Sequence, residues 1–152
     1  DVHPNATLSK NPHAAAEVLR SDATRNMMVL YVGKDGPVLT VSPKDCGQLL
    51  ENMADRSDQW RSLDVSILQF GILERYLGWT LERITTDVKM GYVHTAAEAI
   101  EKVDAGDYAA AFILRPTPVS SVAEVASHLE KMPPKSTYFY PKALTGMVLR
   151  RL

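Results

Sequence analysis

The chain has 152 residues, of which 45% are hydrophobic and 23% charged, and its formal net charge is −1. This size and composition fit one soluble globular domain with a real core. No apolar run approaches the roughly 18 residues of a membrane span, and the single cysteine, Cys46, excludes an intrachain disulfide.

We therefore expect residues 1–152 to form a single domain, with residues 1–10 loosely ordered. The N-terminus has neither the basic region nor the apolar region of a secretory signal, so we expect a cytoplasmic protein without a membrane partner. The first residue is not Met, which suggests the C-terminal part of a longer protein.

In chain order, the first predicted element is a helix over residues 12–20, with Asn11 as its N-cap. Two apolar runs of β type, 27–33 and 37–42, flank an Asp-Gly pair and predict a β-hairpin. Pro43 ends the second strand and opens a predicted helix of about residues 44–54.

The next predicted helix begins at Ser62 as its cap and ends before Gly78, because the apolar residues between them fall on one helical face. Gly71 lies inside this helix and costs about 1 kcal/mol relative to Ala. Either the backbone approaches another element closely there, or the glycine is a tolerated defect.

The last third of the chain predicts alternating strands and helices. Residues 91–94 and 108–114 read as strands, the second buried on both faces, and residues 145–151 as a final strand. A capping box at Thr95 opens a helix that ends near Gly106, and Thr117 caps a second helix to about Glu130. The predicted class is mixed α/β: a β-hairpin, helices and a β-α-β-α-β unit in one mixed sheet.

Charge is distributed unevenly along the chain. Residues 131–152 carry five basic and no acidic side chains, whereas the preceding 130 residues carry 12 basic and 18 acidic ones. A basic end on an acidic body suggests a local anion site. A lysine-fringed strand edge that discourages aggregation explains the same pattern.

Two loops supply the candidate site. The junction after the predicted strand 108–114 offers Arg115, Thr117 and Ser120 beside a helix N-terminus, where backbone N–H groups favour anions. The alternative is that the hydroxyls only cap the helix.

The second loop is the proline-rich stretch Met132–Lys142, whose three prolines make a stiff path. If it folds back onto the first loop, the cationic and hydroxyl groups form a phosphate or carboxylate pocket, and tyrosine rings pack on the organic part. Its candidate binding residues are Lys135, Ser136, Thr137, Tyr138, Tyr140 and Lys142. Core packing is the alternative for the aromatic rings.

Other chemistry has little support in the sequence. The four histidines have no metal-ligand spacing, and no phosphate-binding glycine loop or nucleophile motif occurs, so we expect no metal and no cofactor. Cys46 reads as a structural thiol, because Asp45 opposes any lowering of its pKa. The slightly acidic overall charge argues against nucleic-acid binding by this domain alone.

Several motifs carry a family resemblance. They are Met132–Lys142 followed by Thr145-Gly146, Leu63–Leu68, Gly106 before Ala110–Leu114, and Pro116-Thr117. In their order and spacing they resemble the C-terminal half of a bacterial and archaeal family known as domain of unknown function ten-fifteen. The chain departs from that pattern at Gln69, where the family has a histidine. If that histidine is functional, Gln69 puts the activity in doubt here.

The resemblance implies a longer protein whose N-terminal half is similar to ParB and sulfiredoxin-like domains, so the missing half is an expected partner. Three hypotheses follow. The domain contributes an anion-binding loop to a phosphate-ester or nucleotide site, it is a non-catalytic interaction or dimerisation module, or it is a ParB-like, DNA-related accessory domain. A small phosphorylated ligand and a second copy of the chain are the other expected partners.

Overall fold

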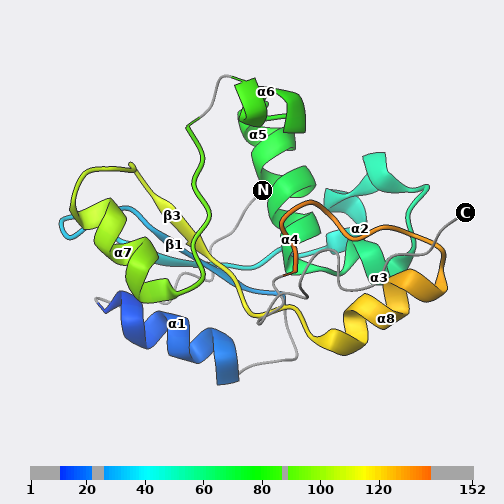
Figure 1. Cartoon of the computed structure of the whole chain (residues 1–152), viewed down its shortest axis with the longest axis horizontal. Coiled ribbons are helices and arrows are strands. Elements are labelled where there is room, and N and C mark those ends of the chain that lie inside the picture. Colours follow the sequence, from blue (N-terminus) through cyan, green and yellow to red (C-terminus); the bar gives the residue numbers. More distant parts are fainter. Residues whose placement is uncertain (1–10, 22–25, 87–88, 138–152) are drawn as a thin grey trace, which may run out of the picture.

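The fold is mixed α/β, as predicted, and Figure 1 shows it as a small sheet with helices around it. The computed structural model describes residues 11–21, 26–86 and 89–137. The elements in order are α1 (Pro12–Ser21), β1 (Met28–Tyr31), β2 (Val38–Val41), α2 (Cys46–Leu49), the 3-10 helix η1 (Glu51–Met53), α3 (Asp58–Arg61), α4 (Asp64–Ser66), the π-helix η2 (Ile67–Glu74), α5 (Arg75–Leu77), α6 (Leu81–Thr86), α7 (Ala96–Asp104), β3 (Ala111–Ile113) and α8 (Val119–Ser127).

Strand β1 lies at the centre of a three-stranded sheet of order β2-β1-β3. It pairs antiparallel with β2, Met28 opposite Val41, which confirms the predicted hairpin. It also pairs antiparallel with β3, Val29 opposite Ile113. Every strand pair among the described residues is therefore antiparallel.

Two strand predictions need correction. Residues 91–94 form no strand: the segment runs unpaired into α7. The predicted strand 108–114 is reduced to β3. It is not buried on both faces, since Ala109 and Ala110 before it are exposed and Ile113 is its one buried residue. The predicted strand 145–151 lies outside the described residues.

The helix caps follow the sequence in part. Asn11 Oδ1 accepts the backbone N–H of His13 at 3.0 Å, and Thr95 Oγ1 accepts that of Glu98 at 3.1 Å, so both predicted caps are confirmed. Ser62 and Thr117 are not caps. Ser62 follows α3 and donates its hydroxyl to the Gln59 carbonyl at 2.9 Å. Helix α8 starts one residue later than predicted, after Pro118, which has no side chain that can cap.

The helix predicted from Ser62 to Gly78 is a continuous run of α4, η2 and α5 whose central eight residues are π-helical. Gly78 ends it in the left-handed conformation, at φ +64°, as the sequence predicts. A Cβ on Gly71 would lie 2.7 Å from Leu49 Cγ, so the glycine permits the close approach of α2. The predicted helix 44–54 is split into α2, capped by Asp45, and η1.

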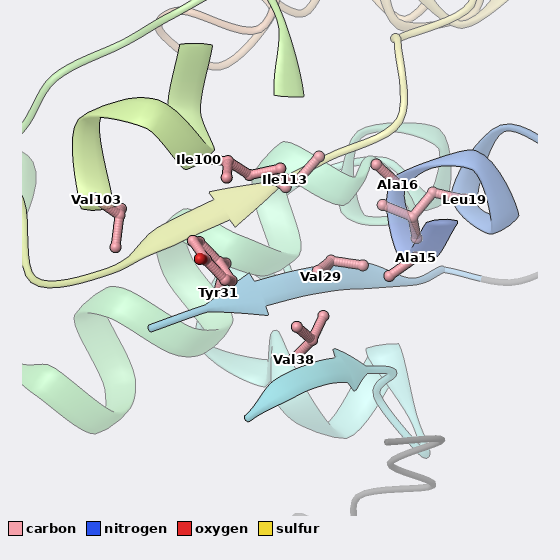
Figure 2. Close-up of a cluster of buried hydrophobic side chains, with 9 residues drawn as sticks. All are labelled: Ala15, Ala16, Leu19, Val29, Tyr31, Val38, Ile100, Val103 and Ile113. Carbon is pink, nitrogen blue, oxygen red and sulfur yellow. The ribbon is translucent and has the colours of Figure 1, made fainter. Parts of the chain in front are cut away.

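The sheet separates two hydrophobic clusters. On one face, side chains from α1 and α7 pack against alternate residues of the strands, and Figure 2 shows this cluster around Val29, Tyr31 and Ile113. On the other face, Met28 and Phe112 meet the helices of the second cluster, which includes Trp60, Phe70 and Val125. Strand alternation thus divides neighbouring residues of β1 between two cores.

Candidate functional site

A groove of about 430 Å³ opens beside the second cluster and is a candidate for a binding site. We call it the Trp60 groove. It is lined by Arg56, Trp60, Phe70, Leu81, Leu129, Glu130, Lys131, Met132, Pro133 and Pro134. The proline-rich stretch that the sequence singled out therefore contributes to this groove through Met132, Pro133 and Pro134, together with Phe70 from η2.

The floor of the Trp60 groove is aromatic and buried. Trp60 is 3% exposed and Phe70 is 8% exposed, and their ring centroids lie 5.2 Å apart in a tilted arrangement. The indole N–H of Trp60 donates to the Lys131 carbonyl at 3.1 Å. This bond joins α3, which contributes the floor of the groove, to the segment that carries the prolines of its wall.

Glu130 fixes the start of α3. The Ser57 backbone N–H donates to its carboxylate at 3.1 Å and the Ser57 hydroxyl donates to its other oxygen. Ser57 Oγ in turn accepts the backbone N–H of Trp60 at 3.2 Å. The hydroxyl bond, together with the positive charge of nearby Arg56, holds the pKa of Glu130 below its usual value. The Arg56 guanidinium lies over the Trp60 ring, 5.4 Å from its centroid.

Leu129 is the most unusual residue at the rim. It is 96% exposed and adopts the left-handed conformation, at φ +58°. Its N–H donates to Ala126 O at 2.9 Å and that of Glu130 to Val125 O at 3.3 Å, so it stands where a helix-ending turn ordinarily has glycine. A leucine there costs about 1 kcal/mol in backbone strain, and its exposed side chain gains little from the rest of the described chain.

The lining of the Trp60 groove is better suited to apolar binding than to catalysis. Among the described residues that form it, the ionisable ones are Arg56, Glu130 and Lys131. Glu130 has a lowered pKa and is occupied by Ser57, so it is a poor general base near neutral pH. An aromatic floor with proline and leucine walls is the usual composition of a site that receives an apolar side chain.

The guanidinium that the sequence analysis placed in an anion site is paired with a carboxylate of the chain itself. Arg115 makes a two-point ion pair with Asp64, Nε to Oδ2 at 2.7 Å and Nη2 to Oδ1 at 2.9 Å, and both side chains are largely buried. Its charge is therefore compensated within the fold. Thr117 is half-buried and Ser120 is exposed in the first turn of α8.

The second predicted loop is only partly described. Lys135 is exposed at φ +60°, with its ammonium 5.8 Å from the centre of the Tyr92 ring. The Ser136 hydroxyl donates to the Pro133 carbonyl at 2.7 Å, and Thr137 is exposed. The candidates Tyr138, Tyr140 and Lys142 lie outside the described residues. The binding role of all these residues stays a prediction.

Two further polar clusters have structural roles. Asn26 donates to Asp64 Oδ1 at 2.7 Å and accepts the Cys46 thiol at 3.6 Å. Burial, with help from nearby carboxylates, raises the pKa of the Cys46 thiol, as a structural cysteine requires. On the opposite face, the Tyr31 hydroxyl donates to Asp104 at 2.6 Å, and this bond is the main reason that its pKa rises to about 12.

Gln69, where the resembled family has a histidine, is buried in η2. Its amide donates to the Trp79 carbonyl at 3.3 Å and so ties the π-helix to the turn before α6. The sequence signal missed Trp60, Phe70 and Leu129 as site residues. Nothing in the sequence indicates that the leucine after α8 has a positive φ. Trp60 and Phe70 are apolar, and the sequence gives no reason to place them in a binding site instead of the core.

Comparison with known proteins adds no identification. No family model, no curated protein and no solved structure matches this chain. The resemblance to the domain of unknown function ten-fifteen stays a prediction. Among the described residues, no helix is long and apolar enough to span a membrane, and no group of three or more His, Cys, Asp or Glu side chains is placed to hold a metal ion.

Proposed function

We propose that this chain is a non-catalytic interaction module whose Trp60 groove receives an apolar side chain of a polypeptide partner. One observation carries the proposal: a groove with a buried aromatic floor has, at its rim, a leucine that is 96% exposed in a strained backbone conformation. Residues in strained backbone conformations cluster at active and binding sites.

The surroundings of the groove support a pre-formed site. The Trp60 indole bond to the Lys131 carbonyl and the two bonds between Ser57 and Glu130 fix its walls before any partner arrives. A site that is rigid in advance loses less conformational entropy on binding. Leu81, 38% exposed, adds an apolar edge from α6.

The anion hypothesis has less support. Its strongest cation, Arg115, is paired with Asp64, and the described part of its second loop contributes one exposed lysine, Lys135. The ParB-like hypothesis rests on the resemblance alone, and a fold-level analogy does not carry function.

Peptides selected from a random library against the purified chain test the proposal. We expect them to carry aliphatic or aromatic anchors and to shift the NMR signals of Trp60 and Phe70. The substitution Leu81→Lys should weaken binding about tenfold, because it places a charge at the apolar edge. Leu77→Lys is the matched control, since Leu77 is 47% exposed but does not line the groove. Equal affinity for the two variants, or peptides that bind elsewhere, would remove the proposal.

A further inference from the structure

The Trp60 groove lies next to an exposed apolar side chain, Leu129, on the same surface of the molecule. Leu129 extends from the end of α8 and is itself one of the residues that border the groove. A twofold dimer uses the same patch on both copies, so it needs a surface that carries both halves of the contact. A projecting side chain next to a cavity of suitable character meets that requirement on a single chain.

Charge at the rim is also self-complementary. Glu130 is negative and Lys131 is positive, so two facing copies can place opposite charges together. Arg56 is already paired with Asp55 of its own chain at 3.8 Å. Lys131 is exposed and makes no ion pair within the described part of the chain, which leaves it available to a partner. Rim charges of this kind set orientation and association rate more than affinity.

We infer that the partner of the Trp60 groove is a second copy of this chain, with Leu129 of each copy inserted between the prolines and aromatic floor of the other. The inference rests on the proposed interaction function and names its partner. It also accounts for the backbone conformation of Leu129. The side chain is almost fully exposed in the single chain, and the dimer supplies the burial that the single chain lacks.

The patch is small, so the dimer is expected to be weak. Stable dimers bury about 800 Å² on each partner, and we therefore expect a dissociation constant of about 10 µM to 1 mM. Sedimentation equilibrium over that range on the full chain should show a reversible monomer–dimer equilibrium.

The variant Leu129→Gly distinguishes an effect on the dimer contact from an effect on the stability of the fold. Glycine is favoured at φ +58°, so the variant should melt at a higher temperature than the wild type while its dimer weakens at least about tenfold. Leu129→Asn, which also tolerates this conformation, should weaken the dimer similarly. Val119→Asp is the matched control, because Val119 is 76% exposed at the start of α8 but lies outside the groove.

A mixed sample of isotope-labelled and unlabelled chain locates the contact. Isotope-filtered NOEs should link Leu129 methyl groups of one copy to the Trp60 and Phe70 rings of the other. A chain that stays monomeric at about 1 mM, or a dimer weakened equally by Val119→Asp and Leu129→Gly, overturns the inference. If selected peptides still occupy the groove of such a monomer, the interaction function stands and only the choice of partner is wrong.

Discussion

The guanidinium of Arg115 and the carboxylate of Asp64 meet through two hydrogen bonds of 2.7 and 2.9 Å. Asp64 opens α4 and Arg115 follows β3, so the pair joins the sheet to the helices of the second cluster. Asn26 adds a third bond to the same carboxylate at 2.7 Å. The side chains of the ion pair are 17% and 10% exposed, which leaves little water to replace a missing partner.

Arg115→Ala should therefore destabilise the fold by about 3 kcal/mol, because it leaves a carboxylate buried without its cation. Chemical denaturation measures the change. The exposed pair of Arg20 with Glu17 provides the control, and Arg20→Ala should cost less than about 0.5 kcal/mol. The double variant Arg115→Ala with Asp64→Ala should be less destabilised than the two single changes combined. Strict additivity would contradict the ion pair.

Gly71→Ala tests the close approach of α2 to the π-helix. A helix interior ordinarily gains about 1 kcal/mol from this change, but the new methyl would lie 2.7 Å from Leu49 Cγ. We expect net destabilisation of about 1 kcal/mol, since overpacking outweighs the helix gain. In a Leu49→Ala background the same change should become neutral or stabilising. A stabilising effect in the wild-type background would show that α2 moves aside freely.

The lowered pKa of Glu130 makes the free energy of unfolding depend on pH in the acidic range. Its carboxylate accepts bonds from Ser57 in the folded chain, so the folded pKa is below the unfolded one. The contribution is present above about pH 4.3, the unfolded value, and is lost as the pH falls through the folded value. Urea unfolding between about pH 5 and 3 should show a weaker pH dependence for Glu130→Gln than for the wild type. Indistinguishable slopes would argue against the Ser57 bonds.

Lys135→Ala tests what is left of the anion hypothesis. With Arg115 neutralised by Asp64, the hypothesis requires phosphate affinity to depend on Lys135 and to fall as salt is added. If the anion hypothesis is right, NMR titration with inorganic phosphate gives millimolar binding in the wild type that Lys135→Ala abolishes. Lys44→Ala, at another exposed lysine, is the control. Absence of binding, or equal binding by all three proteins, would end the hypothesis.

Local signals in the sequence predicted much of the fold. The Asp-Gly pair between apolar runs, the Asn11 cap, the Thr95 cap and the Gly78 stop each act within a few residues, and the structure confirms all four. Such signals depend on backbone conformation and nearby hydrogen bonds alone.

Tertiary contacts decided what the sequence could not show. Residues 91–94 have strand-like composition, but no strand among the described residues pairs with them. The pairing of Arg115 with Asp64, 51 positions earlier, is invisible in the sequence. The proline-rich stretch was recognised as rigid, yet its neighbours Trp60 and Phe70 come from separate helices.

Strand β1 sends Val29 and Tyr31 into one hydrophobic cluster and Met28 into the other, and both ladders of the described sheet depend on its backbone. Unfolding of either cluster would therefore expose one face of this four-residue strand. Heating should accordingly produce one calorimetric transition instead of two, with the slowest-exchanging amides of the protein in β1.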